Sequence, residues 1–197
     1  MAFFKNLFSS SKKKQDEEVK KQPTSPLAID DAFVHNFINK GGKFIYCLSE
    51  EKVKENLVNI LEENNWTELS YKKDFLEKFL PKDGVEIINK LDQAFPLFTS
   101  CEFLIAENGS ILFSSNQIGS ERISCLTQNF IVLAKASQIV ENNGDSLTGI
   151  KAKYPYDIPT NISSINNFSP NNQDGDNFLN YGANNSKNLY LLLLEDF

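Results

Sequence analysis

Two apolar runs decide the fold: Phe130-Ile131-Val132-Leu133-Ala134-Lys135 in the middle of the chain and Leu189-Tyr190-Leu191-Leu192-Leu193-Leu194 near its last residue. An almost continuous apolar run of this kind is typical of a strand that is buried on both faces of a sheet. Such strands occur in parallel sheets whose faces are covered by helices. The two runs therefore favour an α/β fold.

Strands and helices are expected to alternate along the rest of the chain. Residues 43–49 favour a strand, and residues 50–64 favour a helix with one apolar stripe. That stripe is formed by Val53, Leu57, Ile60 and Leu61. Residues 102–106 and 111–114 flank an Asn-Gly turn, which predicts a β-hairpin. The other expected elements are a strand at 66–71, helices at 72–80 and 85–95, a helical turn at 122–126 and a helix that begins at Ser137.

This alternation predicts an open, mostly parallel sheet with helices on both faces. In such sheets, ligands bind at the carboxyl ends of the strands. Residues 29–197 are expected to form this single domain, and residues 1–28 are expected to form a flexible tail and linker. Inside the domain, residues 161–188 are rich in Asn and predict a long loop, which can be a lid, an interaction surface or an ordinary surface loop.

The charge of the chain is unevenly distributed. Residues 1–22 carry six lysines and three acids, a balance of +3, so the net charge of −6 leaves −9 on the remaining residues. An acidic body argues against nucleic-acid binding, which needs a basic face. In the tail, Phe4, Leu7 and Phe8 would share one helix face, so residues 1–14 can make weak contact with an anionic membrane surface or dock into a partner groove. The apolar runs are far shorter than the roughly 18 residues that cross a bilayer.

The cysteines do not form a recognisable site. Cys47, Cys101 and Cys125 are widely spaced and include no C-x-x-C pair, so neither a disulfide framework nor a zinc site is predicted. An iron–sulfur cluster held by this chain alone would need about four thiolates. The single histidine, His35, has no ligand-like neighbours and is expected to be structural. Free cysteines indicate a reducing compartment, and we expect a cytoplasmic protein.

The hairpin holds the candidate site. Its turn, Glu107-Asn108-Gly109-Ser110, follows an apolar strand, and the carboxylate of Glu107 can serve as a nucleophile, a base or a turn-stabilising acceptor. Arg122 can hold a carboxylate bidentately or form a surface ion pair. Ser110, Ser114 and Ser124 are candidates to line the same cleft as Asn108 and Gly109. Gly-rich phosphate loops, nucleophile elbows and zinc-protease motifs do not occur in the sequence.

Residues of the middle segment, about 95–142, resemble the LUD domain, a lactate-utilisation family that includes the C-type subunit of the bacterial lactate oxidation system. The matching positions are Ala106-Glu107-Asn108-Gly109-Ser110, the strand 111–114, Arg122, Ser124, Leu126 and the strand 130–133, with Asn108 in place of the usual Thr. The resemblance implies a fold similar to the sugar-phosphate isomerase and CoA-transferase group. It also implies an accessory role beside two iron–sulfur partner subunits that oxidise L-lactate to pyruvate, with a small carboxylate as ligand and no cofactor on this chain.

The same residues leave an enzymatic alternative open. Class I CoA-transferases carry a Ser-Glu-Asn-Gly turn whose glutamate forms a thioester with CoA, and Ala106-Glu107-Asn108-Gly109 resembles that turn. In this reading the protein is a stand-alone CoA-transferase-like or small-carboxylate enzyme. Glu107 is its nucleophile, and backbone amides near Gly109 stabilise the oxyanion.

Overall fold

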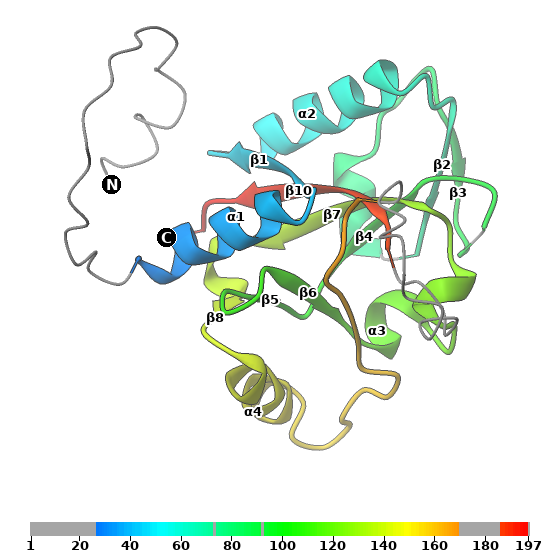
Figure 1. Ribbon diagram of the computed structural model, residues 1–197. Helices are drawn as coiled ribbons and strands as arrows, with labels where there is room; N and C mark the ends of the chain where they lie inside the picture. Colours follow the sequence, from blue (N-terminus) through cyan, green and yellow to red (C-terminus); the bar gives the residue numbers. More distant parts are fainter. Residues whose placement is uncertain (1–26, 73, 92, 170–185, 197) are drawn as a thin grey trace, which may run out of the picture.

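The two apolar runs lie side by side at the centre of the main sheet. A computed structural model of the chain describes residues 27–72, 74–91, 93–169 and 186–196. In it, β7 (Asn129–Lys135) and β10 (Asn188–Leu194) pair in parallel within a six-stranded sheet of order β1-β10-β7-β4-β2-β3. All five pairings of this sheet are parallel, which confirms the predicted parallel architecture (Figure 1).

Both central strands are buried on both faces, as their composition predicts. Successive side chains of a strand point to opposite faces, and in β10 the odd-numbered leucines join one core cluster while its even-numbered residues join the other. The first cluster takes Leu189, Leu191 and Leu193, and the second takes Tyr190, Leu192 and Leu194. Each such side chain contributes about 1.5–3 kcal/mol through removal from water. The centre of the domain is therefore fixed by the two runs.

Helix α2 (Glu50–Glu63) covers one face of the main sheet. It follows β1 (Lys43–Cys47) and begins at Ser49, whose side chain accepts a hydrogen bond from the backbone N–H of Lys52. The predicted stripe is confirmed, because Val53, Leu57, Ile60 and Leu61 are all buried. After β2 (Glu68–Tyr71), the short 3₁₀ helix η2 (Asp74–Phe79) packs on the same face at the position of the expected helix 72–80.

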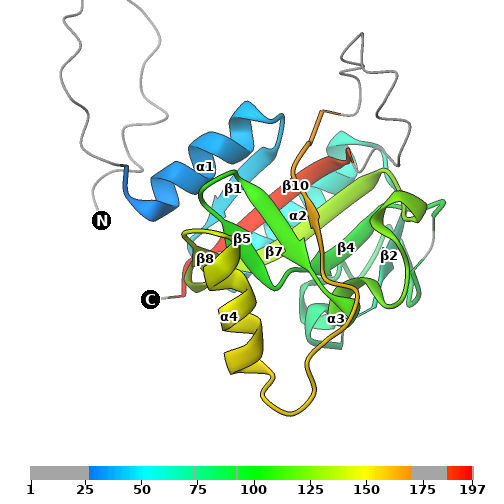
Figure 2. The same cartoon turned by 60° about the horizontal axis from the view of Figure 1, so that its bottom comes forward.

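Helix α1 (Ile29–Asn39) and a second, smaller sheet cover the other face. The smaller sheet has the order β8-β5-β6-β9 and contains the predicted hairpin, in which β5 (Phe103–Ile105) and β6 (Ser110–Phe113) pair antiparallel. Its outer strands are β8 (Ile139–Val140) and β9 (Ser163–Ile165). Helix α4 (Asn143–Lys153) lies on the far side of this sheet, where Ile105, Leu112 and Ile150 pack together (Figure 2).

Two predicted helices are wrong. Residues 85–95 instead contain β3 (Glu86–Ile88), and β4 (Leu97–Ser100) follows, because parallel pairing with β2 outweighs a weak helical pattern. The helix expected from Ser137 starts later. The chain forms η4 (Ala136–Gln138) and β8 first, and α4 begins after Asn142, whose side chain accepts from the backbone N–H of Asp145.

The remaining elements are short. Helix α3 (Ser115–Ile118) follows the hairpin, and η3 (Ile123–Cys125) occupies the expected helical turn at 122–126. The predicted loop 161–188 contains β9, and its residues 170–185 lie outside the described part of the chain. The predicted tail lies outside it too, up to residue 26, and α1 begins at Ile29. In the described residues, none of the helices has the length and apolarity that a membrane crossing requires.

Candidate functional site

A pocket of about 600 Å³ opens at the carboxyl ends of the central strands. Ser100 ends β4, Lys135 ends β7 and Leu194 ends β10, and all three line it. This is the edge of a parallel sheet where ligands bind, because helix and loop connections diverge there and leave a crevice. The location agrees with the expectation from the fold class.

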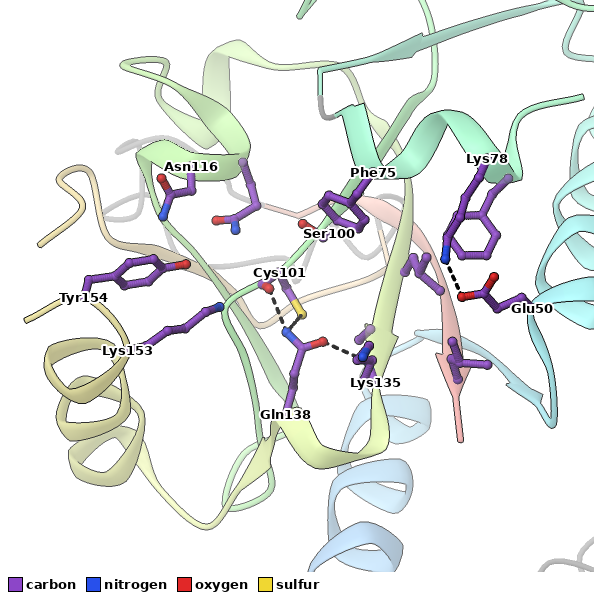
Figure 3. Close-up of a pocket in the computed structure, with 15 residues that line it drawn as sticks. Glu50, Phe75, Lys78, Ser100, Cys101, Asn116, Lys135, Gln138, Lys153 and Tyr154 are labelled. Carbon is purple, nitrogen blue, oxygen red and sulfur yellow. Dashed lines mark hydrogen bonds and ion pairs between the residues drawn. The ribbon is translucent and has the colours of Figure 1, made fainter. Parts of the chain in front are cut away.

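The pocket has one apolar wall and one polar wall. The apolar wall is formed by Phe75, Phe79, Leu133 and Leu194, which come from η2, β7 and β10. The polar wall is formed by Asn116, Gln138, Lys153 and Tyr154. Figure 3 shows Lys153 and Tyr154 on one side of the opening and Phe75 on the other. On the side of Phe75, the charged residues that line the pocket, Glu50 and Lys78, pair with each other.

A fully buried carboxylate, Glu102, lies behind the polar wall and organises it. Its residue is 1% exposed, and five side chains converge on its two oxygens. The donors are the Ser114 hydroxyl at 2.7 Å, the Asn116 amide at 3.1 Å, the Gln117 amide at 3.0 Å, the Lys153 ammonium at 3.0 Å and the Tyr154 hydroxyl at 3.0 Å. These residues belong to β6–α3 and to the end of α4, so Glu102 ties two segments together at the pocket.

The ion pair of Glu102 and Lys153 stays charged. Burial by itself would raise the pKa of Glu102, but hydrogen bonds from Ser114, Lys153 and further donors lower it to about 2. Burial by itself would lower the pKa of Lys153, but hydrogen bonds with Tyr154 and Glu102, together with the charge of Glu102, raise it. The pocket wall thus carries a permanent cation that rests on a permanent buried anion.

Gln138 fixes the floor of the pocket. Its amide nitrogen donates to the carbonyl oxygens of Cys101 at 2.8 Å and of Glu102 at 3.0 Å, and its amide oxygen accepts from the backbone N–H of Lys135 at 2.8 Å. Burial raises the pKa of the Cys101 thiol, which lines the same floor. The polar atoms of the Gln138 amide are therefore committed to the protein, and the thiol stays protonated.

Two further lysines lie at the pocket. Lys78 pairs with Glu50 at the start of α2. Lys135 forms an ion pair with Asp196 at 3.8 Å, and its side chain is 58% exposed. An ammonium group has three donors. Lys153, whose side chain is 49% exposed and donates to Glu102, can therefore offer a further hydrogen bond to an incoming anion.

The predicted turn residues lie away from this pocket, at the far end of the hairpin. Glu107 is exposed, and the turn 107–110 packs against α1: the Asn36 amide donates to the Ala106 carbonyl at 2.8 Å, and Lys40 donates to the Asn108 carbonyl at 2.7 Å. Gly109 has a φ of +65° and lies so close to α1 that a Cβ would come within 2.5 Å of the Phe37 nitrogen. None of Glu107, Asn108, Gly109 and Ser110 lines the pocket. Their predicted roles stay predictions.

Of the other predicted site residues, Ser114 reaches the pocket wall and Arg122 and Ser124 do not. Ser114 is brought to the polar wall through its bond to Glu102. Arg122 and Ser124 lie in the segment before β7, where Arg122 is exposed, and neither lines the pocket. The sequence predictions missed Glu102, Gln138, Lys153 and Tyr154. One signal was available: Glu102 is a charged residue inserted between Cys101 and the apolar strand that starts at Phe103.

A metal centre is not formed by the residues that the structure describes, since no three of their His, Cys, Asp and Glu side chains cluster. The three cysteines are free thiols, with Cys47 and Cys101 buried and Cys125 exposed.

Comparison with known proteins identifies the domain. The family model described as LUD domain matches residues 31–194. The chain is also similar to a solved structure described as a DUF162 family protein from Deinococcus radiodurans, with 13% sequence identity and a TM-score of 0.61 over 87% of this chain and 100% of that chain. That likeness shows a shared fold. No curated protein matches the chain.

Proposed function

Because this chain belongs to the LUD domain family, which is associated with lactate utilisation, we propose that it is an accessory subunit of an L-lactate oxidation system. In this proposal the chain binds a small carboxylate, lactate or pyruvate, and partner subunits carry the iron–sulfur clusters that take up the electrons. The observation that carries the proposal is the pocket at the carboxyl edge of the sheet, with the ammonium group of Lys153 on its polar wall.

The polar wall supports carboxylate binding in a specific way. Besides the Lys153 ammonium, Glu102 accepts hydrogen bonds from four uncharged donors, two hydroxyls and two amides. Lys153 can therefore share its ammonium with a ligand without leaving the buried carboxylate unpartnered. Hydrogen bonds between an ammonium and a carboxylate are about twice as strong as neutral ones. A ligand carboxylate on Lys153 would therefore be held by charge and by hydrogen bonds together.

The proposal also includes a reducing, cytoplasmic compartment. The free thiols of Cys47, Cys101 and Cys125 support it, since exposed thiols such as Cys125 persist where glutathione keeps them reduced. Iron–sulfur partners favour the same compartment.

Affinity purification of the full chain from its native cells tests the proposal. We expect brown eluates with broad visible absorption from iron–sulfur partners, and we expect L-lactate to bleach this absorption as it reduces the clusters. A mock purification from cells without the tagged chain is the control. A colourless protein recovered alone, or coloured partners that L-lactate leaves unchanged, would refute the proposed role.

A further inference from the structure

The pocket is much larger than lactate. Its volume of about 600 Å³ falls in the range of roughly 300–1,000 Å³ that typically holds drug-sized ligands. A carboxylate ligand held on Lys153 would leave the apolar wall of Phe75, Phe79, Leu133 and Leu194 without contact if the side chain of the ligand were only a methyl group. A longer apolar side chain would fill more of this volume and contact the wall.

The charges of the pocket accept one anionic group and disfavour a second. Lys153 lies on the polar wall, whereas Lys78 is already paired with Glu50 and Lys135 with Asp196. The first turn of α2 carries Glu50 and Glu51, so the positive end of that helix dipole is already matched by acids and would repel a phosphate. A monoanion fits this distribution better than a dicarboxylate or a nucleotide.

The opposite wall requires the rest of the ligand to be apolar. Phe75 is 52% exposed at the pocket, unlike Phe79, Leu133 and Leu194, which are buried beside it. The amide groups at the floor are committed to the backbone through Gln138, so they offer little to a polar ligand tail. An apolar tail would cover Phe75 and gain the free energy of removing its surface from water.

We infer that this pocket binds monocarboxylates whose apolar side chain is larger than the methyl group of lactate, with the carboxylate on Lys153 and the tail against Phe75. The inference rests on the proposed function, from which it takes 2-hydroxy acids as the class of ligand.

Isothermal titration of the full chain with a homologous series tests it. We expect the affinity to rise from L-lactate through L-2-hydroxybutyrate to L-2-hydroxyhexanoate by about fourfold for each added methylene, the factor that corresponds to burial of one such group. L-malate and AMP, which each carry a second negative charge, test whether the pocket disfavours that charge, and both should bind more weakly than 2-hydroxyhexanoate.

Matched variants locate the two ends of the ligand. Lys153→Met should lower the affinity for every acid of the series at least tenfold, whereas Lys151→Met, an exposed lysine of the same helix, should change none of them. Phe75→Ala should remove most of the chain-length dependence while lactate affinity stays within twofold. Tyr156→Ala, a fully exposed aromatic outside the pocket, is the control for Phe75. Circular dichroism verifies that each variant is folded.

The outcomes separate the two proposals. A flat series, tighter binding of malate or AMP, or no binding of any monocarboxylate at millimolar concentration would overturn the inference. A steep series on a chain that recovers no coloured partners would leave the inference standing and refute the lactate-oxidation role. A series without chain-length dependence, on a chain recovered in a brown complex that L-lactate bleaches, would support the lactate-oxidation role and refute the inference.

Discussion

Two glutamates at the two ends of one strand have opposite surroundings. Glu102 precedes β5, is buried, and accepts hydrogen bonds from five side chains at the wall of the pocket. Glu107 follows the same strand, is exposed, and lies on a turn that packs against α1. The turn has the more conspicuous sequence motif, but the polar side chains converge at the pocket.

The difference shows what makes a turn motif conspicuous. Gly109 is required by a close backbone approach and a positive φ, and Asn108 accepts from the backbone N–H of Ser110 at 2.9 Å, so both residues are explained by the turn itself. The residues that hold Glu102 have no such local pattern. Substitutions at the two ends of β5 therefore test the pocket wall and the hairpin turn against each other.

The largest effect is expected at the buried end. Glu102→Gln should lower the free energy of unfolding by about 3–5 kcal/mol, because it leaves Lys153 without its buried partner and turns an amide toward the donors of Asn116 and Gln117. Urea unfolding followed by circular dichroism measures it. A loss below about 1 kcal/mol would contradict the assignment of Glu102 as the organising group of the wall.

Acid should act through the same residue. The pKa of Glu102 is about 2 in the folded chain and ordinarily 4.5, so its stabilising contribution is complete above about pH 5 and is lost as the pH falls from about 4.5 toward 2. The loss amounts to about 3 kcal/mol for this group.

The chain contains other acids, so the comparison must be made against a variant. The difference in unfolding free energy between the wild type and Glu102→Gln should shrink as the pH is lowered through this window. A difference that is the same at pH 7 and at pH 3 would show that folding does not lower the pKa of Glu102.

An intermediate effect is expected at the hairpin turn. Gly109→Ala should destabilise the chain by about 2–4 kcal/mol, because the new Cβ would lie 2.5 Å from the Phe37 nitrogen at a φ of +65°. Gly84→Ala is the matched control: its φ is +82°, but no atom lies within 4 Å of the new Cβ, so only about 1 kcal/mol of backbone strain is expected. Equal losses in thermal unfolding would refute the close packing of the turn on α1.

The sequence predicts those parts of the molecule that depend on local pattern. The strands β7 and β10, the stripe of α2 and the hairpin follow from runs and periodicities within a few residues. The short strands β3 and β4 do not, because their pairing partners decide them, and at β3 a weak helical pattern covers the same residues. Helix α1 also went unpredicted, although its buried Phe33, Val34 and Phe37 are visible in the sequence.

The candidate site is the least predictable part, because its members meet only in the fold. Glu102 comes before β5, Gln138 from η4, and Lys153 and Tyr154 from the end of α4. The hydrogen bonds from Lys153 and Tyr154 to Glu102 span 51 and 52 residues, a separation over which no spacing rule applies. The carboxyl edge of the sheet was predictable, but the residues that gather there were not.

The smallest effect on stability is expected at the exposed glutamate, where it serves the alternative function. Glu107→Gln should change the free energy of unfolding by less than about 0.5 kcal/mol, since an exposed carboxylate becomes an exposed amide of the same shape. Its value lies in the chemistry: if the chain is a CoA-transferase that acts through Glu107, this variant must lose transfer from acyl-CoA and its thioester intermediate. Transfer by the wild type that disappears in Glu107→Gln but survives in Lys153→Met would move the active site to the hairpin turn, whereas the reverse order would keep it at the pocket.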